Sequence, residues 1–379
     1  MAALVCGVSV LLGVIPGCVT AGRSFAGETV DNSSDLKVDD FAKDVLTGGL
    51  TTVFLPLVYI IVFIIGLPTN SIALWVFGYR TKKKHPATIY MANLALAVLL
   101  FIFWFPLKIA YHVNGNNWIF GEGLCRVLVS FYYGNMYCSI LFMTSLSVQR
   151  YWVIVDPISQ SKKKTTIAYA VSISIWILIV LGTMPLYLTT QTAYITNLDI
   201  TTCHDVLPEL KLSSTMFDYF TSLAIGLFFF PAVLTVIVYV LMIMTLKASC
   251  TEANIGKSRR RAIELIITVL IMYLVCFTPS NIVLVVHYYM IKFYGVSNVY
   301  AFYIVALCLS SINSCIDPFV YYFVSKDFRD HVKNTMMCRS VRAAERIRAS
   351  FTSMKNSKKS NIYRSTRTTS STATSNTNY

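Results

Sequence analysis

The sequence predicts an all-α membrane protein, a bundle of seven transmembrane helices with a short amphipathic helix after the seventh span. Hydrophobic residues make up 55% of the 379 residues and charged residues only 13%, whereas soluble domains carry about 25% charged residues. Seven apolar segments reach the roughly 20 residues that a membrane span needs. Basic residues gather in alternate connections between these segments, which is typical of the cytoplasmic loops of membrane proteins.

The composition also excludes several classes of function. The net charge is +14, but the basic residues lie in short loops and in the C-terminal tail, so we expect a membrane topology signal and no nucleic-acid partner. Ten cysteines are too sparse for a disulfide scaffold, and the five histidines do not cluster along the chain. We therefore expect no metal site.

The spans follow from the apolar runs, each a helix because a span must satisfy its own backbone hydrogen bonds. We expect them at residues 53–77, 87–111, 124–155, 167–188, 217–246, 263–290 and 299–324. The first, third and fifth connections are basic, with residues 80–84, 162–164 and 257–261. This bias places the N-terminus outside the cell, in a multi-pass protein of the plasma membrane.

The N-terminal region divides into two predicted parts. Residues 1–20 resemble a secretory signal peptide, with a short membrane anchor as the alternative. Residues 21–52 form an acidic extracellular tail, which we expect to be flexible because it lacks the apolar content of a core. Asn32 begins an Asn-Ser-Ser acceptor for N-glycosylation.

The C-terminal region follows a receptor domain of residues 53–325. Residues 326–337 are predicted to form an amphipathic helix on the membrane surface, since Phe328 and Val332 share one face. Cys338 at the membrane edge is a candidate for palmitoylation or a cysteine without a modification. Residues 338–379 form a disordered Ser/Thr-rich tail, which is either a regulatory phosphorylation surface or an inert solubilising segment.

One mark per helix, in the expected order, makes the chain resemble the rhodopsin-like G-protein-coupled receptors. The marks are Asn70 in GLPTN, NLALA at residues 93–97, Arg150 in QRY, Trp176, Pro231, Pro279 in CFTP and Asp317-Pro318 in DPFVY, which ends at Tyr321. The resemblance implies an activation switch at Arg150, Tyr151, Pro279, Asp317, Pro318 and Tyr321. It also implies a disulfide between Cys125 and Cys203, whereas Cys138, Cys276, Cys308 and Cys315 are expected to be buried apolar fillers.

Two positions depart from the family pattern. Val98 stands where the family usually has the aspartate that holds a sodium ion, so we expect no cofactor and doubt a sodium site beside Asp317. Gln149 stands where an acid usually precedes the arginine, so Arg150 lacks an adjacent carboxylate.

The loop sequence ITTCHDVLPE at residues 200–209 resembles the protease-activated receptors, and among them the trypsin-sensitive type 2. The stretches FPLKIAYH, GNNWIFGE and MYCSILFMTSLSVQRYW extend the resemblance. It implies cleavage between Arg23 and Ser24 by a trypsin-like serine protease, whose acidic pocket pairs with a guanidinium. The new N-terminus would act as a tethered ligand made of Ser24, Phe25, Ala26, Gly27, Glu28 and Thr29.

The resemblance also implies a ligand pocket at the outer end of the bundle. Its predicted residues are Tyr133, His204, Asp205, Val206, Leu207, Glu209, Tyr288, Tyr300 and Tyr303. Asp205 and Glu209 would pair with the new α-ammonium, or Asp205 is a solvated loop acid. The tyrosines would line the pocket, or belong to the aromatic belt of the membrane interface.

The expected partners are extracellular trypsin-like proteases, the lipid bilayer, heterotrimeric G proteins acting through phospholipase C and calcium, arrestins, receptor kinases and other receptor copies as dimers. Two alternatives stay open at this stage. One is a rhodopsin-like receptor for a diffusible peptide or nucleotide. The other is a membrane enzyme or transporter, which would need polar pairs near the membrane midplane.

Overall fold

The computed structural model describes residues 25–29, 35–81, 85–155, 162–208, 216–248, 253–294, 299–324, 328–330 and 332. The chain divides into two compact units, residues 1–324 and 325–379. Every helix and strand named below lies in the first unit. The predicted amphipathic helix at 326–337 falls almost wholly outside the described residues, and its four described residues are helical.

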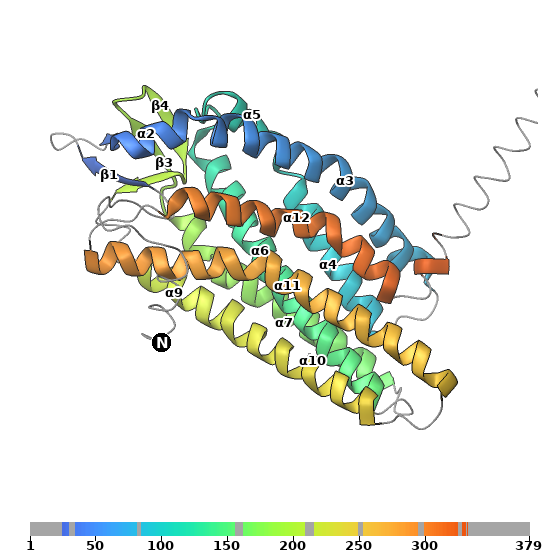
Figure 1. Ribbon diagram of the computed structural model, residues 1–379. Helices are drawn as coiled ribbons and strands as arrows, with labels where there is room; N and C mark the ends of the chain where they lie inside the picture. Colours follow the sequence, from blue (N-terminus) through green and yellow to red (C-terminus); the bar gives the residue numbers. More distant parts are fainter. Residues whose placement is uncertain are drawn as a thin grey trace, which may run out of the picture. The chain divides into compact units, whose positions relative to one another are not determined.

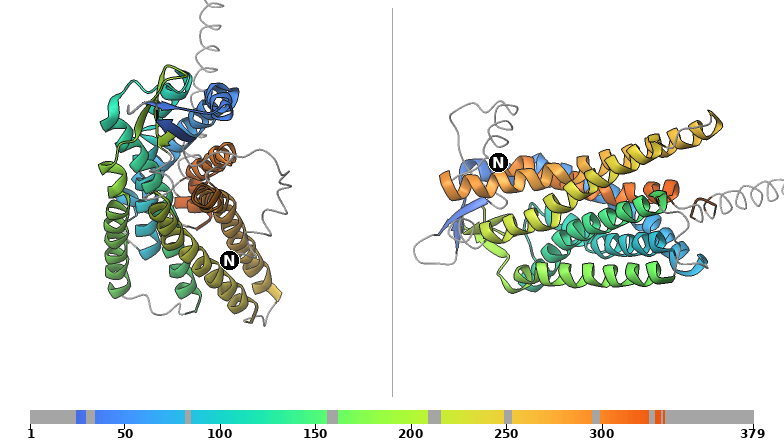
Figure 2. Two further views of the ribbon diagram at one scale, coloured as in Figure 1. Left: turned by 90° about the vertical axis from the view of Figure 1, so that its left-hand side faces the viewer. Right: turned by 90° about the horizontal axis from the view of Figure 1, so that it is seen from below.

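The described residues contain seven helical runs that are long and apolar enough to cross a membrane. They run alongside one another in Figures 1 and 2, and all seven predicted spans are confirmed within them. The elements of the bundle are α3 (Leu55–Trp75), η2 (Val76–Arg80), α4 (Pro86–Ile102), α5 (Phe105–Val113), α6 (Gly121–Val155), α7 (Lys162–Leu188), α9 (Phe217–Ala224), η4 (Ile225–Phe229), α10 (Phe230–Ala248), α11 (Ala253–Tyr294) and α12 (Tyr300–Val324).

Helix α3 is apolar on both faces, but only one face is buried in the bundle. Tyr59, Val62 and Gly66 are buried at helical spacing and face the bundle. Ile61 and Ile64, between them, are exposed to 55% and 64%. A helix that is hydrophobic all round can bury one side in protein and leave the other to lipid. The chain is thus built as a membrane bundle.

The second predicted span is two helices instead of one. Helix α4 ends at Ile102, and α5 begins at Phe105 with Pro106 in its first turn. Proline has no backbone N–H and crowds the preceding turn, so Pro106 is accommodated in the first turn of a new helix, α5, and α4 ends before it. The expectation of one unbroken helix over 87–111 is therefore wrong at residues 103–104, where the chain turns.

Polar side chains hold neighbouring helices together at two of the family marks. Asn70 Nδ2 in α3 donates to the Ser314 carbonyl in α12 at 2.8 Å. Trp176 Nε1 in α7 donates to Asn93 Oδ1 in α4 at 2.9 Å. Such bonds fix the packing of helices that have no hydrophobic drive to associate inside lipid.

A small sheet covers one end of the bundle, which we call the sheet end. Its strands are β1 (Phe25–Thr29), β2 (Leu36–Lys37), β3 (Thr192–Ile195), β4 (Ile200–Cys203) and β5 (Val206–Pro208). Their order in space is β4-β3-β2-β1-β5. The strands from the N-terminal segment thus lie between those from the loop that joins α7 to α9, as Figures 1 and 2 show.

The expectation of a flexible tail over residues 21–52 is wrong for its described part. After β1 and β2, Asp39 caps helix α2 (Asp40–Thr47) by accepting from the Ala42 N–H at 2.8 Å. The π-helical turn η1 (Leu50–Phe54) then leads into α3. Ala42 and Leu46 are buried four residues apart. The segment is short of apolar residues, but it packs on a core that the rest of the chain supplies.

Candidate functional site

Strand β1 places the segment after Arg23 inside the sheet, between β2 and the edge strand β5. It runs parallel to β5, with Phe25 opposite Val206 and Gly27 opposite Pro208. The Phe25 N–H donates to the Asp205 carbonyl at 2.7 Å. Phe25 has an exposed fraction of 0%. An aromatic side chain that is fully removed from water contributes about 1.5–3 kcal/mol, so Phe25 is an anchor.

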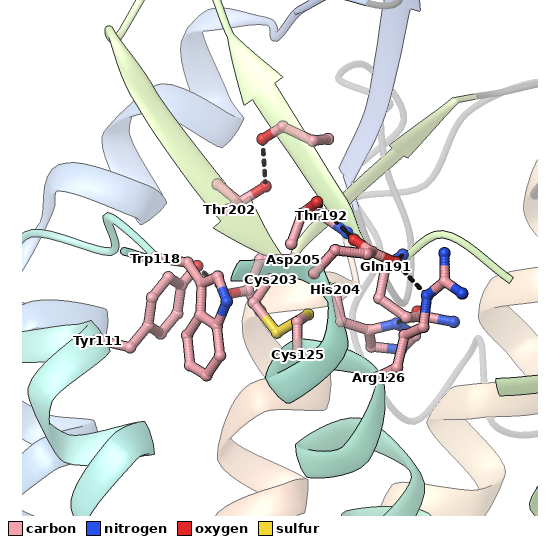
Figure 3. The surroundings of a disulfide bond; sticks show 12 residues. Tyr111, Trp118, Cys125, Arg126, Gln191, Thr192, Thr202, Cys203, His204 and Asp205 are labelled. Carbon is pink, nitrogen blue, oxygen red and sulfur yellow. Dashed lines mark hydrogen bonds and ion pairs between the residues drawn. A yellow bond between two sulfur atoms is a disulfide. The ribbon is translucent and has the colours of Figure 1, made fainter. Parts of the chain in front are cut away.

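A disulfide fixes the strands that receive β1. Cys125 in the first turns of α6 is bonded to Cys203 at the end of β4, with Cα atoms 5.7 Å apart. The pairing expected from the resemblance is confirmed. Figure 3 shows the bond beneath the sheet, with Asp205 close to it. The loop that contains β3, β4 and β5 is therefore held to α6 immediately before β5.

Glu122 provides a second attachment between α6 and this loop. Its carboxylate accepts from the backbone N–H groups of Gln191 and Thr192 at 2.8 and 2.9 Å. It also accepts from the Thr192 hydroxyl and from Arg126 Nε, each at 2.5 Å. A carboxylate that receives four donors is a strong fixed point. It therefore sets the start of β3.

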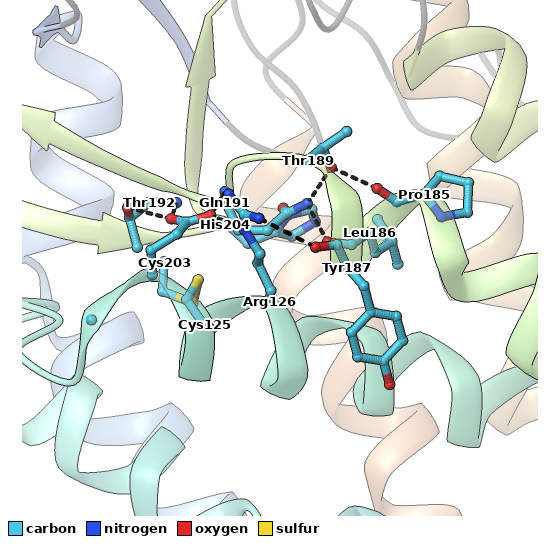
Figure 4. A network of polar contacts seen from close by, with 12 residues as sticks. Cys125, Arg126, Pro185, Leu186, Tyr187, Thr189, Gln191, Thr192, Cys203 and His204 are labelled. Carbon is cyan, nitrogen blue, oxygen red and sulfur yellow. Dashed lines mark hydrogen bonds and ion pairs between the residues drawn. A yellow bond between two sulfur atoms is a disulfide. The ribbon is translucent and has the colours of Figure 1, made fainter.

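His204 lies at the turn between β4 and β5 and connects the loop to the bundle. Its φ of 70° is in the left-handed region. Its Nδ1 lies 2.7 Å from Gln191 Oε1, and its Nε2 lies 3.1 Å from the Tyr133 hydroxyl. Figure 4 shows Gln191 and His204 side by side above α6. These contacts hold His204 in an unfavourable backbone conformation. The carbonyl of the next residue, Asp205, then points toward β1.

Asp205 is not a solvated loop acid. Its carboxylate accepts from the Tyr111 hydroxyl of α5 at 2.5 Å, while its carbonyl accepts from Phe25. One residue thereby connects strand β1 to the second span. Below it, a cavity lies between the sheet and the bundle. Its lining includes Tyr59, His112, Tyr132, Tyr133, His204 and Asp205.

Three of the predicted pocket tyrosines are interior residues. Tyr133, Tyr288 and Tyr303 have exposed fractions of 1–2%. The hydroxyls of Tyr133 and Tyr303 lie 3.5 Å apart, and Tyr288 stacks on Phe220 with ring centroids 5.5 Å apart. The pocket position is thus favoured over the membrane-interface alternative for these three. Val206 and Leu207 are buried, and they pair with β1 from the neighbouring strand β5.

Several predicted site residues lie outside the described part of the chain. These are Arg23, Ser24, Asn32, Glu209 and Cys338, and the side chains of Ala26 and Tyr300 are likewise not described. Conversely, the prediction missed Tyr111, Glu122 and Gln191, as well as Leu36 and Phe41 beside β1. Tyr111 and Glu122 stand within the family-like stretches FPLKIAYH and GNNWIFGE, which was the available signal.

Known proteins resemble the whole chain and not only its bundle. Residues 69–321 match the family described as "7 transmembrane receptor (rhodopsin family)". Proteinase-activated receptor 2 of Bos taurus is 63% identical over 93% of this chain and 92% of its own length. The human protein of that name is also 63% identical, over 95% and 89%. Proteinase-activated receptor 1 of Xenopus laevis is 38% identical over 79% and 70%.

The chain belongs to the proteinase-activated receptors of the rhodopsin family. It is therefore a multi-pass membrane receptor and not an enzyme, and both statements agree with the sequence prediction. The enzyme or transporter alternative is wrong. Membership in this family does not favour the other alternative, a receptor for a diffusible peptide or nucleotide.

Two residues of the predicted switch, Arg150 and Tyr151, lie near the C-terminal end of α6, whose first turns carry the disulfide. Tyr151 packs on a cluster of Val238, Tyr239 and Met242 in α10. Among the described residues no carboxylate pairs with Arg150, in accord with Gln149 beside it. Packing between α6 and α10 therefore stands where the family usually has an ion pair.

A hydrogen bond joins α11 and α12 close to the proline of α11. Pro279 lies inside α11, and the carbonyl of Cys276, three residues earlier, accepts from the Ser310 hydroxyl of α12 at 2.9 Å. In α12, the buried Asp317 accepts from Asn313 Nδ2 at 3.1 Å through both carboxylate oxygens. The Ser310 bond thus joins α12 to α11 beside Pro279.

The remaining predicted switch residues and four cysteines of the described helices lie inside the bundle. Pro318 lies inside α12, and Tyr321 is fully buried with its ring 5.5 Å from that of Phe77. Cys138, Cys276 and Cys308 are free and buried, and Cys315 is free and half-buried. Their predicted place as fillers within helices is confirmed.

The Glu122 attachment leads to a stability prediction. Glu122→Ala leaves the Gln191 and Thr192 N–H groups without their acceptor, which costs about 1–3 kcal/mol. Arg126→Ala is the matched control, since it removes one partner of a half-exposed pair worth about 0–1 kcal/mol. The apparent melting temperature of the purified receptor should fall clearly more for Glu122→Ala. An equal fall for both variants would contradict this account.

Proposed function

We propose that this receptor is activated when a trypsin-like serine protease cuts between Arg23 and Ser24, and that the new N-terminus serves as a tethered ligand at the sheet end. One observation carries the proposal. The residues that follow the cleavage site form a strand inside the sheet, with Phe25 fully buried and its N–H 2.7 Å from the Asp205 carbonyl. The relatives are named as proteinase-activated receptors, which supports the same mechanism.

The proposed trigger is a new charge and not a new strand pairing. The segment from Phe25 onward pairs with β5 in the uncut chain, so pairing alone does not distinguish the active state. What only cleavage creates is an α-ammonium on Ser24, one residue before the Phe25 N–H that lies against Asp205. A cation beside a partly buried carboxylate interacts more strongly than it does in water. The new charge is therefore the proposed trigger, and Asp205 its proposed partner.

The signal would travel inward along residues already in contact. From Asp205, Tyr111 leads to α5, and from the adjacent His204 the path continues through Tyr133 to Tyr303 in α12. Helix α12 also holds the Ser310 contact to α11 beside Pro279. Prolines allow α11 and α12 to adopt more than one bend. A ligand can shift the populations of these conformations.

The expected output is coupling to heterotrimeric G proteins, with phospholipase C and calcium downstream, followed by receptor kinases and arrestins at the Ser/Thr-rich tail. The proposed setting is the plasma membrane with the N-terminus outside, as the basic loops favour. A signal peptide, a glycan on Asn32, a palmitoyl group on Cys338 and receptor dimers belong to this proposal as expectations from the sequence.

We infer that Asp317 holds no sodium ion. Val98, fully buried and apolar, stands where the family usually has a second acid, and both Asp317 oxygens accept from Asn313. Sodium prefers several oxygen ligands with negative charge, as hard cations do. The residues present do not fit such a site.

The cleavage proposal predicts loss of the trypsin response in Arg23→Ala. Cells that express this variant should show no calcium rise with trypsin, because the S1 pocket of the protease lacks its cation. A free peptide Ser-Phe-Ala-Gly-Glu-Thr should still activate it. Arg23→Lys is the matched control and should respond to trypsin. A full trypsin response of Arg23→Ala would overturn the cleavage site.

The Asp205 proposal predicts coupling between a charge on the ligand and a charge on the receptor. Acetylation of the peptide's N-terminus should raise its EC50 about tenfold on the parent receptor, which corresponds to about 1.4 kcal/mol. On Asp205→Asn the same acetylation should have little effect, while the amide oxygen can still accept from Tyr111. An equal loss on both receptors would assign the ammonium to another partner.

The sodium inference predicts that agonist potency does not change when sodium in a membrane binding assay is replaced by N-methylglucamine at constant ionic strength. Val98→Asp should introduce a sodium dependence, because it restores the acid that the family usually has. Sodium dependence in the parent receptor would show that the inference is wrong.

A further inference from the structure

Part of the chain's own N-terminal segment lies over the proposed ligand. Strand β2 pairs antiparallel with β1, with Leu36 opposite Thr29 and Lys37 opposite Glu28. The Leu36 side chain has an exposed fraction of 1%, whereas Lys37 is exposed. Alternate residues of a strand point to opposite faces. Leu36 is thus the residue of β2 that points inward.

Leu36 fills the space where a side chain on ligand residue 27 would lie. A Cβ placed on Gly27 would lie 2.7 Å from Leu36 Cδ1 and 2.8 Å from Leu36 Cβ. The Cδ1 methyl could rotate away, but Cβ moves only with the backbone. That backbone is held, because the Leu36 carbonyl accepts from the Thr196 N–H at 2.9 Å and Leu36 pairs with Ile195 in β3. Glycine is therefore required for steric reasons.

Phe41 packs on the ligand's aromatic anchor. Its ring meets that of Phe25 edge to face, with centroids 6.3 Å apart and planes at 77°. Phe41 is in the first turn of α2, which Asp39 caps. Pairs of this geometry contribute beyond the area that they bury. Phe41 thus touches the residue that the site buries most completely.

The segment that carries Leu36 and Phe41 is attached to the bundle and its loop at several points. The Asn197 side chain accepts from the Val38 N–H at 3.3 Å and donates to the Val38 carbonyl at 2.8 Å. In the last turn of α2 and just beyond it, Asn116 Nδ2 donates to the Leu46 carbonyl at 2.5 Å and to the Thr51 hydroxyl at 2.9 Å. Residues 36–51 are therefore part of the receptor scaffold, although they lie between the ligand and the first span.

We propose that Leu36 and Phe41 form a wall of the receptor's peptide-binding site, and that Leu36 selects glycine at the fourth ligand position. This inference rests on the proposed function, since it takes residues 24–29 as the ligand. Cleavage after Arg23 leaves residues 36–51 attached, so the wall is present in the cut receptor. It follows that the pocket for a peptide agonist is built partly from the tail and not from the bundle and loop alone.

The test uses two free peptides, Ser-Phe-Ala-Gly-Glu-Thr and Ser-Phe-Ala-Ala-Glu-Thr. They are applied to full-length receptor that carries Arg23→Ala and Phe25→Ala, so that neither cleavage nor the receptor's own Phe25 competes. The ratio of their EC50 values in a calcium assay measures the preference for glycine. Any effect of the alanine on the free peptide is the same for every receptor and cancels when these ratios are compared.

On this parent receptor the alanine peptide should be about tenfold weaker or more, since overpacking a filled site typically costs this much. With Leu36→Gly the ratio should fall below about threefold, because no Cβ remains to clash. With Leu36→Ala it should stay near the parent ratio, because the Cβ at 2.8 Å is retained. An unchanged ratio in Leu36→Gly, with normal surface expression, would overturn the selection by Leu36.

Phe41→Ala should raise the EC50 of the glycine peptide about tenfold through loss of the Phe25 contact. Lys43→Ala in the same helix is the matched control, since Lys43 is exposed, and it should change the EC50 less than twofold. Equal potency on Phe41→Ala and on the parent would show that the wall does not include Phe41. If neither peptide activated the parent receptor, the proposed function itself would fail, and this inference with it.

Discussion

The sheet end depends on the attachment of one loop to one helix. The disulfide between Cys125 and Cys203 and the carboxylate of Glu122 hold the loop between α7 and α9 to the first turns of α6. Without these two attachments, β3, β4 and β5 would be short strands on a long connection, and such strands are marginal in water. With them, the loop is a fixed template onto which the N-terminal segment adds two more strands.

This template explains how a segment with few apolar residues becomes ordered. An eight-residue helix such as α2 is not stable by itself, and a two-residue strand is less so. Each obtains its partners from distant parts of the chain, β2 from Ile195 and Thr196, and α2 from Asn116. Contacts with the bundle and its loop therefore offset the entropy cost of ordering the tail.

The bundle could be predicted from the sequence because the membrane imposes a length and a polarity that every span must obey. The break at residues 103–104 escaped prediction, although Pro106 is a visible signal, because proline is common in spans that continue. The ordered tail escaped because its composition is that of a disordered segment, and only contacts across the fold reverse that expectation. Phe25, Tyr133 and His204 were found through the family resemblance. Glu122 lies at the end of the stretch GNNWIFGE, but the stretch does not indicate its contacts, and Leu36 lies in none of the family-like stretches.

The position of Leu36 changes what counts as the ligand module. A side chain at position 27 would clash with Leu36, and the Phe25 ring contacts Phe41 in helix α2. The two halves of this recognition lie within a single stretch of chain from residue 24 to residue 41. In chimaeric receptors, residues 24–41 should therefore be exchanged together. A hexapeptide transferred alone would lack Leu36 and Phe41, the residues that it contacts.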